Sequence, residues 1–282
     1  NYFQAVGKPR PAMILSLSRQ VLLLIPALLI LPRFFGLDGV FLAGPLADLG
    51  SAILTGTWLF FEMRSLGEFL RERGYTVLGV RLAGHATNLE AMIRTRYPDW
   101  LASVEDGYHL LRSHCEKVFL MGLSMGGVLS LTQAARLPVD GVAAMSTPYF
   151  FPVEWAGNNP WLLRLASPIL RTQAKGEGNW FTPELAEDHI SYERNPVRPA
   201  YELTQLLEVM RSELANIQAP ALVIQSRDDD YVLEHNAEPL FASIGSRDKQ
   251  LVWTDRASHV ITRDGDTSRV FEPIAEFLQA HT

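Results

Sequence analysis

Gly122-Leu123-Ser124-Met125-Gly126-Gly127 carries the strongest structural signal in this chain of 282 residues. The apolar run Val118–Met121 precedes it, and a helix-like run, residues 127–137, follows it. Gly-x-Ser-x-Gly between a strand and a helix is typical of a sharp turn that exposes the serine hydroxyl above a sheet, and side chains at the glycines are expected to collide with the neighbouring strand or helix. The stretch therefore predicts that Ser124 is a nucleophile. It also predicts that the Met125 N–H, at the positive end of the following helix, stabilises an oxyanion.

A nucleophilic serine needs a base, and the base needs a third group that fixes its tautomer. In folds with this turn, the acid follows the serine along the chain and the histidine comes last. The acid candidates are Asp228, Asp229 and Asp230, which come directly after a buried-strand pattern at residues 221–225. That position places an acid at the functional edge of a parallel sheet. Periodicity does not choose among the three aspartates.

His259 is the histidine whose position fits the base. It lies between a strand pattern at residues 249–253 and a helix pattern at residues 268–279, so a later strand delivers it to the same edge of the sheet. The other histidines fit less well, because they precede the serine, lie in a mid-chain insertion, follow the aspartates too closely or lie in the terminal tail: His85, His109, His114, His189, His235 and His281.

Strand and helix patterns alternate along most of the chain. This alternation predicts the α/β class, with a mostly parallel central sheet and flanking helices. The other expected elements are helices over residues 63–73 and from Pro98 toward Cys115, and strands over residues 75–80, 118–123 and 141–145.

These segments resemble the bacterial carboxylesterase and monoacylglycerol lipase group of the α/β-hydrolase superfamily. The resemblance extends from about Met63 to the C-terminus. It implies an α/β-hydrolase fold with an inserted helical cap, and it implies that the acid is Asp229, the second residue after Arg227. The segments that carry it are Gly122–Gly127, Ser226–Asp229 and Ser258–Ile261, with support from Leu66–Tyr75, Arg81–His85 and Arg94–Trp100.

One departure from the group concerns the other oxyanion donor. Its members usually carry His-Gly after the first core strand, and the backbone that follows donates one N–H to the oxyanion. Here Thr55-Gly56 stands in that place, so the resemblance implies the Thr57 N–H as the donor beside Met125. Because the donors are backbone groups, loss of the histidine side chain does not by itself abolish activity.

The strand–helix alternation stops between Pro148 and Pro220, where α/β-hydrolases carry a cap or lid. The expected organisation is a core formed by residues 63–148 and 220–282, with a cap formed by residues 149–219.

The cap is rich in aromatic residues, and a cap above the serine favours an apolar acyl pocket. Phe150, Trp155 and Trp161 are the candidate substrate-binding residues. The alternative for each of these rings is ordinary packing in the core of the cap.

Residues 1–62 form an atypical apolar segment that leads into the core, and residues 1–4 resemble the remnant of an expression linker. The apolar run Val21–Leu31 is short for a bilayer span, which needs about 20 residues, and Pro26 interrupts it. Three interpretations stay open: an extra layer packed on the core, a lipid-surface dock or anchor, and a pocket cover or oligomer contact.

The composition is that of a globular protein, with 48% hydrophobic and 20% charged residues. A formal net charge of −6 without a basic tract argues against a nucleic acid partner. No Cys/His spacing suggests a metal site, and no cofactor is expected. We expect a cytoplasmic protein, with membrane association through the N-terminal segment left open. The sequence does not fix the oligomeric state.

The motif and the resemblance together imply a serine hydrolase, of carboxylesterase or monoacylglycerol lipase type, that cleaves carboxylic esters with apolar acyl chains. Ser124 attacks the carbonyl, His259 moves the proton and Asp229 orients His259. A lysophospholipase or thioesterase would use the same triad. The alternative from another class is a catalytically weak, membrane-docked lipid-binding protein, which the missing His-Gly pair would explain.

Overall fold

The computed structural model describes residues 24–34, 36–37, 39, 43, 64–174, 178–183, 185, 192 and 194–282. Contacts divide the chain into two compact units, residues 1–68 with 190–194 and residues 69–189 with 195–282. In the first unit a helix over residues 25–34 exposes apolar side chains, among them Leu29 and Phe34. No described helix combines the length and the apolar character that a bilayer crossing requires.

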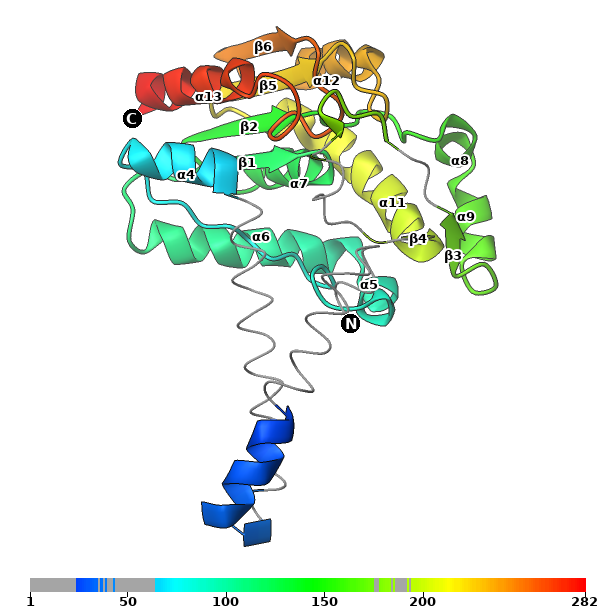
Figure 1. Ribbon diagram of the computed structural model, residues 1–282. Coiled ribbons are helices and arrows are strands. Elements are labelled where there is room, and N and C mark those ends of the chain that lie inside the picture. Colours follow the sequence, from blue (N-terminus) through cyan, green and yellow to red (C-terminus); the bar gives the residue numbers. More distant parts are fainter. Residues whose placement is uncertain are drawn as a thin grey trace. The chain divides into compact units, whose positions relative to one another are not determined.

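The second unit is built on a parallel sheet whose described strands have the order β1-β2-β5-β6 (Figure 1). The two central strands are buried along their whole length, as expected of a parallel sheet covered on both faces. Because the strands are parallel, their carboxyl ends meet at one edge. The strands are β1 (Phe119–Leu123), β2 (Gly141–Met145), β5 (Ala221–Ser226) and β6 (Lys249–Thr254).

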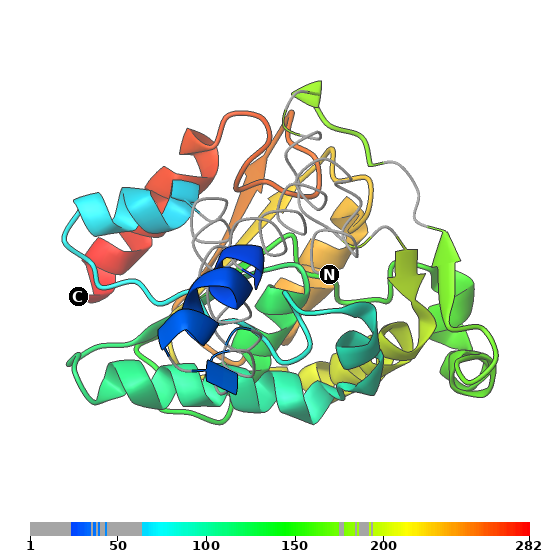
Figure 2. The same cartoon turned by 60° about the horizontal axis from the view of Figure 1, so that its bottom comes forward.

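Helices cover both faces of this sheet. α7 (Met125–Ala134) and α12 (Ala237–Ser243) each connect neighbouring parallel strands in the same direction, so right-handed crossovers place both on one face. α6 (Tyr97–Arg112) and α11 (Val197–Glu213) pack against α7. α13 (Ser268–His281) covers the other face (Figures 1 and 2). This arrangement is the expected α/β-hydrolase fold.

α7 and α13 differ in their pattern of apolar residues because they differ in burial. All residues of α7 from Gly127 to Ala134 are buried, since the helix lies between the sheet and two other helices. α13 buries only a stripe at helical spacing, which includes Val270, Ile274 and Phe277, and leaves its other side in water.

The remaining elements are short, and most lie within residues 149–219, the segment predicted to be a cap. α4 (Arg64–Glu72) and α5 (Leu89–Arg94) precede the first described strand. An apolar cluster that includes Ala156, Leu163 and Val197 packs the cap helices together. The cap elements before α11 are α8 (Glu154–Asn158), α9 (Pro160–Ala166) and the paired strands β3 (Thr172–Ala174) and β4 (Arg194–Pro196), and 3-10 turns lie at Leu214–Asn216 and Glu234–Asn236.

A buried carboxylate joins the cap to the core. Glu202 on α11 is 3% exposed and accepts hydrogen bonds from Arg198 Nε at 2.9 Å and from the Tyr97 N–H at 3.3 Å. Arg96 Nε lies 3.6 Å from the same carboxylate. This cluster fixes α11 to the N-terminal end of α6.

The expected strand over residues 75–80 is wrong, because the structure assigns neither helix nor strand to this stretch. Two of its side chains lie against α6 instead: a Cβ added at Gly107 would lie 2.6 Å from Val80 Cγ2 and 3.7 Å from Leu78 Cδ2. A short apolar run does not distinguish packing on a helix from pairing in a sheet.

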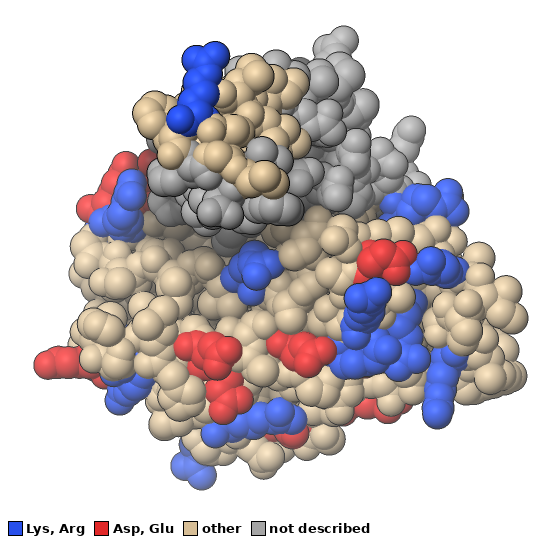
Figure 3. Space-filling view, turned by 90° about the horizontal axis from the view of Figure 1, so that it is seen from below, with Lys and Arg blue, Asp and Glu red and all other residues tan. Residues whose placement is uncertain are grey.

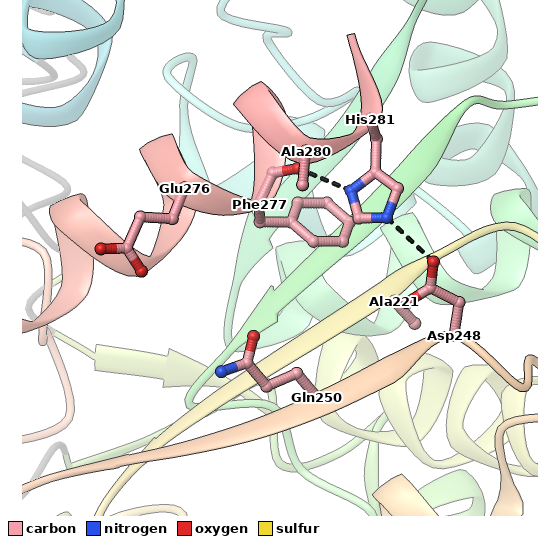
Figure 4. A pocket seen from close by; sticks show the side chains of 7 residues that line it. All are labelled: Ala221, Asp248, Gln250, Glu276, Phe277, Ala280 and His281. Atoms are coloured by element: carbon pink, nitrogen blue, oxygen red, sulfur yellow. Dashed lines mark hydrogen bonds and ion pairs between the residues drawn. The ribbon is translucent and has the colours of Figure 1, made fainter.

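A pocket of about 500 Å³ lies at the amino edge of the sheet, by the starts of β5 and β6 (Figure 4). The His281 ring there donates to the Phe277 carbonyl at 2.6 Å and contacts Asp248 Oδ2 at 3.0 Å. Burial lowers the pKa of His281, but these two hydrogen bonds outweigh it, so the pKa lies above its ordinary value. The pocket is at the edge opposite the strand ends that carry the predicted triad.

The turn from β1 into α7 is the sharp turn that the sequence predicts. Ser124 has a φ of 56° and a ψ of −121°, a backbone conformation that residues with side chains rarely adopt. Its N–H donates to the Met145 carbonyl at 2.8 Å, and its carbonyl accepts from the Gly127 N–H at 2.9 Å. A Cβ at Gly122 would lie 2.0 Å from the Gly126 carbonyl carbon, whereas a Cβ at Gly126 would meet no atom within 4 Å. The expected collision is therefore confirmed at Gly122 and wrong at Gly126.

This contrast predicts different effects of alanine at the two glycines. Gly122→Ala should lower the free energy of unfolding by about 3 kcal/mol, because backbone atoms cannot move out of the way cheaply. Gly126→Ala should change it by less than about 1 kcal/mol, since the added methyl group meets open space. Urea unfolding of both variants measures the difference, and equal losses would contradict the packing described for the turn.

Candidate active site

The predicted catalytic residues follow three different strands of the sheet. Ser124 comes directly after β1, Asp229 follows β5 and His259 follows β6. The carboxyl ends of the parallel strands lie at the same edge of the sheet (Figure 1). All three residues come after strand ends, so they lie at that edge.

Unusual backbone conformations gather at the same edge. Four described residues other than glycine have a positive φ, and three of them come close behind strands β1, β2 and β6: Ser124 with 56°, Ser146 with 43° and Arg256 with 54°. Strained backbone of this kind concentrates at functional sites, where the surrounding structure holds it in place.

Asp229 and His259 are in direct contact. His259 Nδ1 lies 3.0 Å from Asp229 Oδ2 and 3.1 Å from Oδ1. The Asp229 side chain is fully buried, whereas the His259 side chain is 19% exposed. A buried carboxylate on Nδ1 fixes the histidine ring so that Nε2 is the nitrogen left for proton transfer.

Neighbouring groups hold the Asp229 carboxylate in its orientation. Oδ1 accepts hydrogen bonds from the Tyr231 N–H at 2.9 Å and the Val232 N–H at 2.8 Å. Oδ2 accepts from Gln225 Nε2 at 3.2 Å. These three donors hold both carboxylate oxygens in place beside His259. The sequence did not predict this role of Gln225, because a single polar residue in a buried strand does not indicate its hydrogen-bond partner.

The three consecutive aspartates have three different partners. Asp229 contacts His259, Asp228 Oδ2 accepts from the Arg256 N–H at 2.7 Å, and Asp230 Oδ2 accepts from the Asn179 N–H at 2.9 Å. The geometry thus separates residues that periodicity left equivalent.

Ser124 lies at this edge without a hydrogen bond to His259 among the described residues. Catalytic hydrogen bonds are often long before substrate binds, so this geometry is compatible with a base that engages Ser124 in the substrate complex. The structure brings Asp229 and His259 together and places Ser124 on the same edge.

Of the two predicted oxyanion donors, Met125 lies within the described residues. Met125 begins α7, where the first N–H groups have no partner inside the helix. Its N–H donates to no backbone carbonyl in the described part of the chain, so it can receive a ligand oxygen. Thr57 lies outside the described residues.

The cap aromatics have no recorded contact with Ser124 or His259 within the described residues. Phe150 is 45% exposed, and its ring centroid lies 5.9 Å from that of His235. The Asn236 amide oxygen fixes its backbone by accepting the Phe150 N–H at 2.8 Å. Trp161 on α9 is 57% exposed, and the side chain of Trp155 lies outside the described part of the structure.

Within the described residues, no group of three or more His, Cys, Asp or Glu side chains is placed to hold a metal ion. On the face shown in Figure 3, acidic and basic side chains are interspersed. The charge on this face does not favour a polyanion such as nucleic acid.

Known proteins are similar to this chain along most of its length. A family model described as serine aminopeptidase S33 matches residues 61–266. The chain is 34% identical over 239 residues to a thermostable monoacylglycerol lipase of Bacillus sp. (strain H-257), which covers 84% of this chain and 92% of that protein. It is 31% identical over 220 residues to a carboxylesterase of Bacillus subtilis (strain 168), which covers 77% of this chain and 87% of that protein.

Two solved structures of lipolytic enzymes are also similar to this chain. A structure from work on LipS and LipT, two metagenome-derived lipolytic enzymes, has a TM-score of 0.68 and 30% sequence identity, covering 78% of this chain and 88% of that chain. A monoacylglycerol lipase of Paleococcus ferrophilus has a TM-score of 0.58 and 21% identity, covering 67% of this chain and 77% of that chain. The second likeness concerns the fold alone.

The contacts of the aspartates predict unequal effects of their amides. Asp229→Asn should lower kcat for a short-chain p-nitrophenyl ester by about 10⁴-fold, because the amide favours the wrong histidine tautomer. Asp228→Asn leaves the His259 contact in place and serves as the matched control, with an expected loss below about tenfold. Equal losses in steady-state assays would contradict the assignment of Asp229.

Proposed function

This chain belongs to the serine aminopeptidase S33 family and is a carboxylic ester hydrolase with the α/β-hydrolase fold, and we propose that Ser124, His259 and Asp229 are its catalytic triad. The observation that carries the proposal is the buried Asp229–His259 contact, at 3.0 Å, on the sheet edge where Ser124 has its strained backbone. Along the chain the three residues have the order serine, acid, histidine, which is the order of the triad in α/β-hydrolases.

In the first half of the reaction, Ser124 Oγ attacks the ester carbonyl carbon while His259 Nε2 takes the hydroxyl proton. The negative charge on the carbonyl oxygen is stabilised by the Met125 N–H and the positive end of α7. Thr57 N–H is the proposed second donor. When the tetrahedral intermediate collapses, the bond to the alcohol oxygen breaks and His259 gives its proton to the alcohol.

In the second half, water attacks the acyl group on Ser124 with His259 again as the base. The bond between the acyl carbon and Ser124 Oγ then breaks, His259 returns the proton to Oγ, and the acid product leaves. Asp229 stabilises the imidazolium in both halves, which is why its own donors matter. The chemistry uses only groups of the chain and water.

We propose esters with apolar acyl chains, of monoacylglycerol type, as the substrate class. Two relatives support this choice, since one is called a monoacylglycerol lipase and the other a carboxylesterase, and both align over most of their length. The cap is the proposed acyl-binding part, with Phe150, Trp155 and Trp161 as lining residues. Support is strongest for Phe150, because it follows β2 at the carboxyl edge and is anchored to Asn236.

We also propose a cytoplasmic location with contact to lipid surfaces through the N-terminal helix over residues 25–34. Exposed apolar side chains on that helix support the contact with lipid surfaces, including Ile25, Leu29 and Phe34. Apolar groups in this number are costly to leave in water and favour a lipid or protein partner.

Ser124→Ala tests the proposed nucleophile. Hydrolysis of a monoacylglycerol should fall by about 10⁴-fold or more, because no other group can form the acyl-enzyme. Ser212→Ala, at an exposed helical serine, is the matched control and should keep full activity. Circular dichroism checks that both variants fold.

The same assay with a lysophospholipid and an acyl thioester compares the substrate classes. We expect the highest kcat/KM for the monoacylglycerol. Retention of a tenth of the activity by Ser124→Ala would reject the triad, and a strong preference for the lysophospholipid or the thioester would reject the substrate class.

A further inference from the structure

One short piece of the cap is hydrogen-bonded to the two loops that carry Asp229 and His259. We call it the strap, residues 178–182. Its backbone N–H groups at Asn179, Phe181 and Thr182 donate to carboxylates of the core. The strap therefore meets the core through charged acceptors at defined positions.

Asp264 accepts most of these hydrogen bonds. It is fully buried, its Oδ2 accepts the Phe181 N–H and its Oδ1 accepts the Thr182 N–H, both at 3.0 Å. Oδ2 also accepts the Ser258 N–H at 3.0 Å. Burial raises the pKa of Asp264, but the hydrogen bonds from Phe181, Ser258 and Thr182 outweigh it and hold the pKa below its ordinary value.

The position of Asp264 along the chain explains how it reaches both partners. Backbone hydrogen bonds from the Arg263 and Asp264 N–H groups to the Val260 carbonyl, at 2.9 and 3.0 Å, turn the chain back on itself after His259. The turn brings the Asp264 carboxylate under the N–H of Ser258, the residue before His259. One buried anion thus holds the histidine loop and the strap together.

The acid loop is linked to the same strap. Asp230, the residue after Asp229, accepts the Asn179 N–H at 2.9 Å. Asp229 is therefore followed by a residue that is bonded to the strap, Asp230. His259 is preceded by Ser258, which is bonded to Asp264. A shift of the strap would move the two loops relative to each other.

We propose that Asp264 is a positioning residue, which holds His259 against Asp229 by tying the histidine loop to the strap of the cap. This inference rests on the proposed triad. The cap is then a fixed part of the catalytic apparatus at this point as well as a cover for substrate. A displacement of about 1 Å in a catalytic group costs up to about 10²-fold in rate, so a loose histidine loop has a large effect.

Asp264→Asn is the first test, with Asp266→Asn as the matched control. The amide keeps the size of the side chain but sets an NH₂ group against at least one of the three N–H donors. Asp266 lies on the same loop and contacts Ser268 and Arg269, away from the strap. Both variants are assayed with a p-nitrophenyl ester, and rates are normalised to the titrated fraction of reactive enzyme.

We expect Asp264→Asn to lower kcat by about 10- to 100-fold with little change in KM, while Asp266→Asn stays near the unmodified enzyme. Asp230→Ala disturbs an exposed link without altering the buried anion, and it should lower kcat by about three- to tenfold.

Two results would overturn the inference. One is an Asp264→Asn enzyme that is less thermostable but has the unmodified kcat per folded molecule, which is the result of a purely structural role. The other is an Asp230→Ala enzyme with unchanged kcat. Failure of the triad itself is recognised separately, since it would show as activity retained by Ser124→Ala.

Discussion

The close approach of the Gly122 position to the Gly126 backbone is the constraint on which the rest of the site depends. It lets the chain leave β1 and enter α7 within one residue, and that residue, Ser124, takes the strained conformation. A wider turn would set the Met125 N–H and the end of the helix dipole farther from the serine hydroxyl. The proposed nucleophile, Ser124, and its proposed oxyanion donor, the Met125 N–H, are thus positioned by one piece of backbone geometry, with little dependence on the cap.

Carboxylates at the carboxyl edge do the remaining positioning. Asp228 joins the acid loop to the histidine loop, and Asp229 orients His259. Asp230 joins the acid loop to the strap, and Asp264 joins the histidine loop to the strap. Each of them accepts backbone N–H groups, and such charge-assisted bonds are stronger than neutral ones. Glu202 on α11 contacts the start of α6, so the described part of the cap is anchored to the core there as well as at the strap.

The sequence predicted the parallel sheet, its strand ends and the contact between Asp229 and His259, because these depend on local patterns and on the chain order of the triad. The resemblance was needed to select Asp229. The strand expected at residues 75–80 was wrong because apolar side chains that pack on α6 give the same pattern as a buried strand. Gln225, Asn236 and Asp264 gave no signal, since their partners are backbone groups and side chains brought close only by the fold.

The measurement that tests the account most directly is the location of a covalent adduct. The enzyme is treated with a fluorophosphonate that mimics the tetrahedral intermediate, and the intact mass and the labelled peptide are determined. We predict one adduct per chain, on the peptide that contains Ser124, formed at the same rate at which ester hydrolysis is lost. A stoichiometric adduct on another residue, or complete loss of hydrolysis without label at Ser124, would contradict the proposed site.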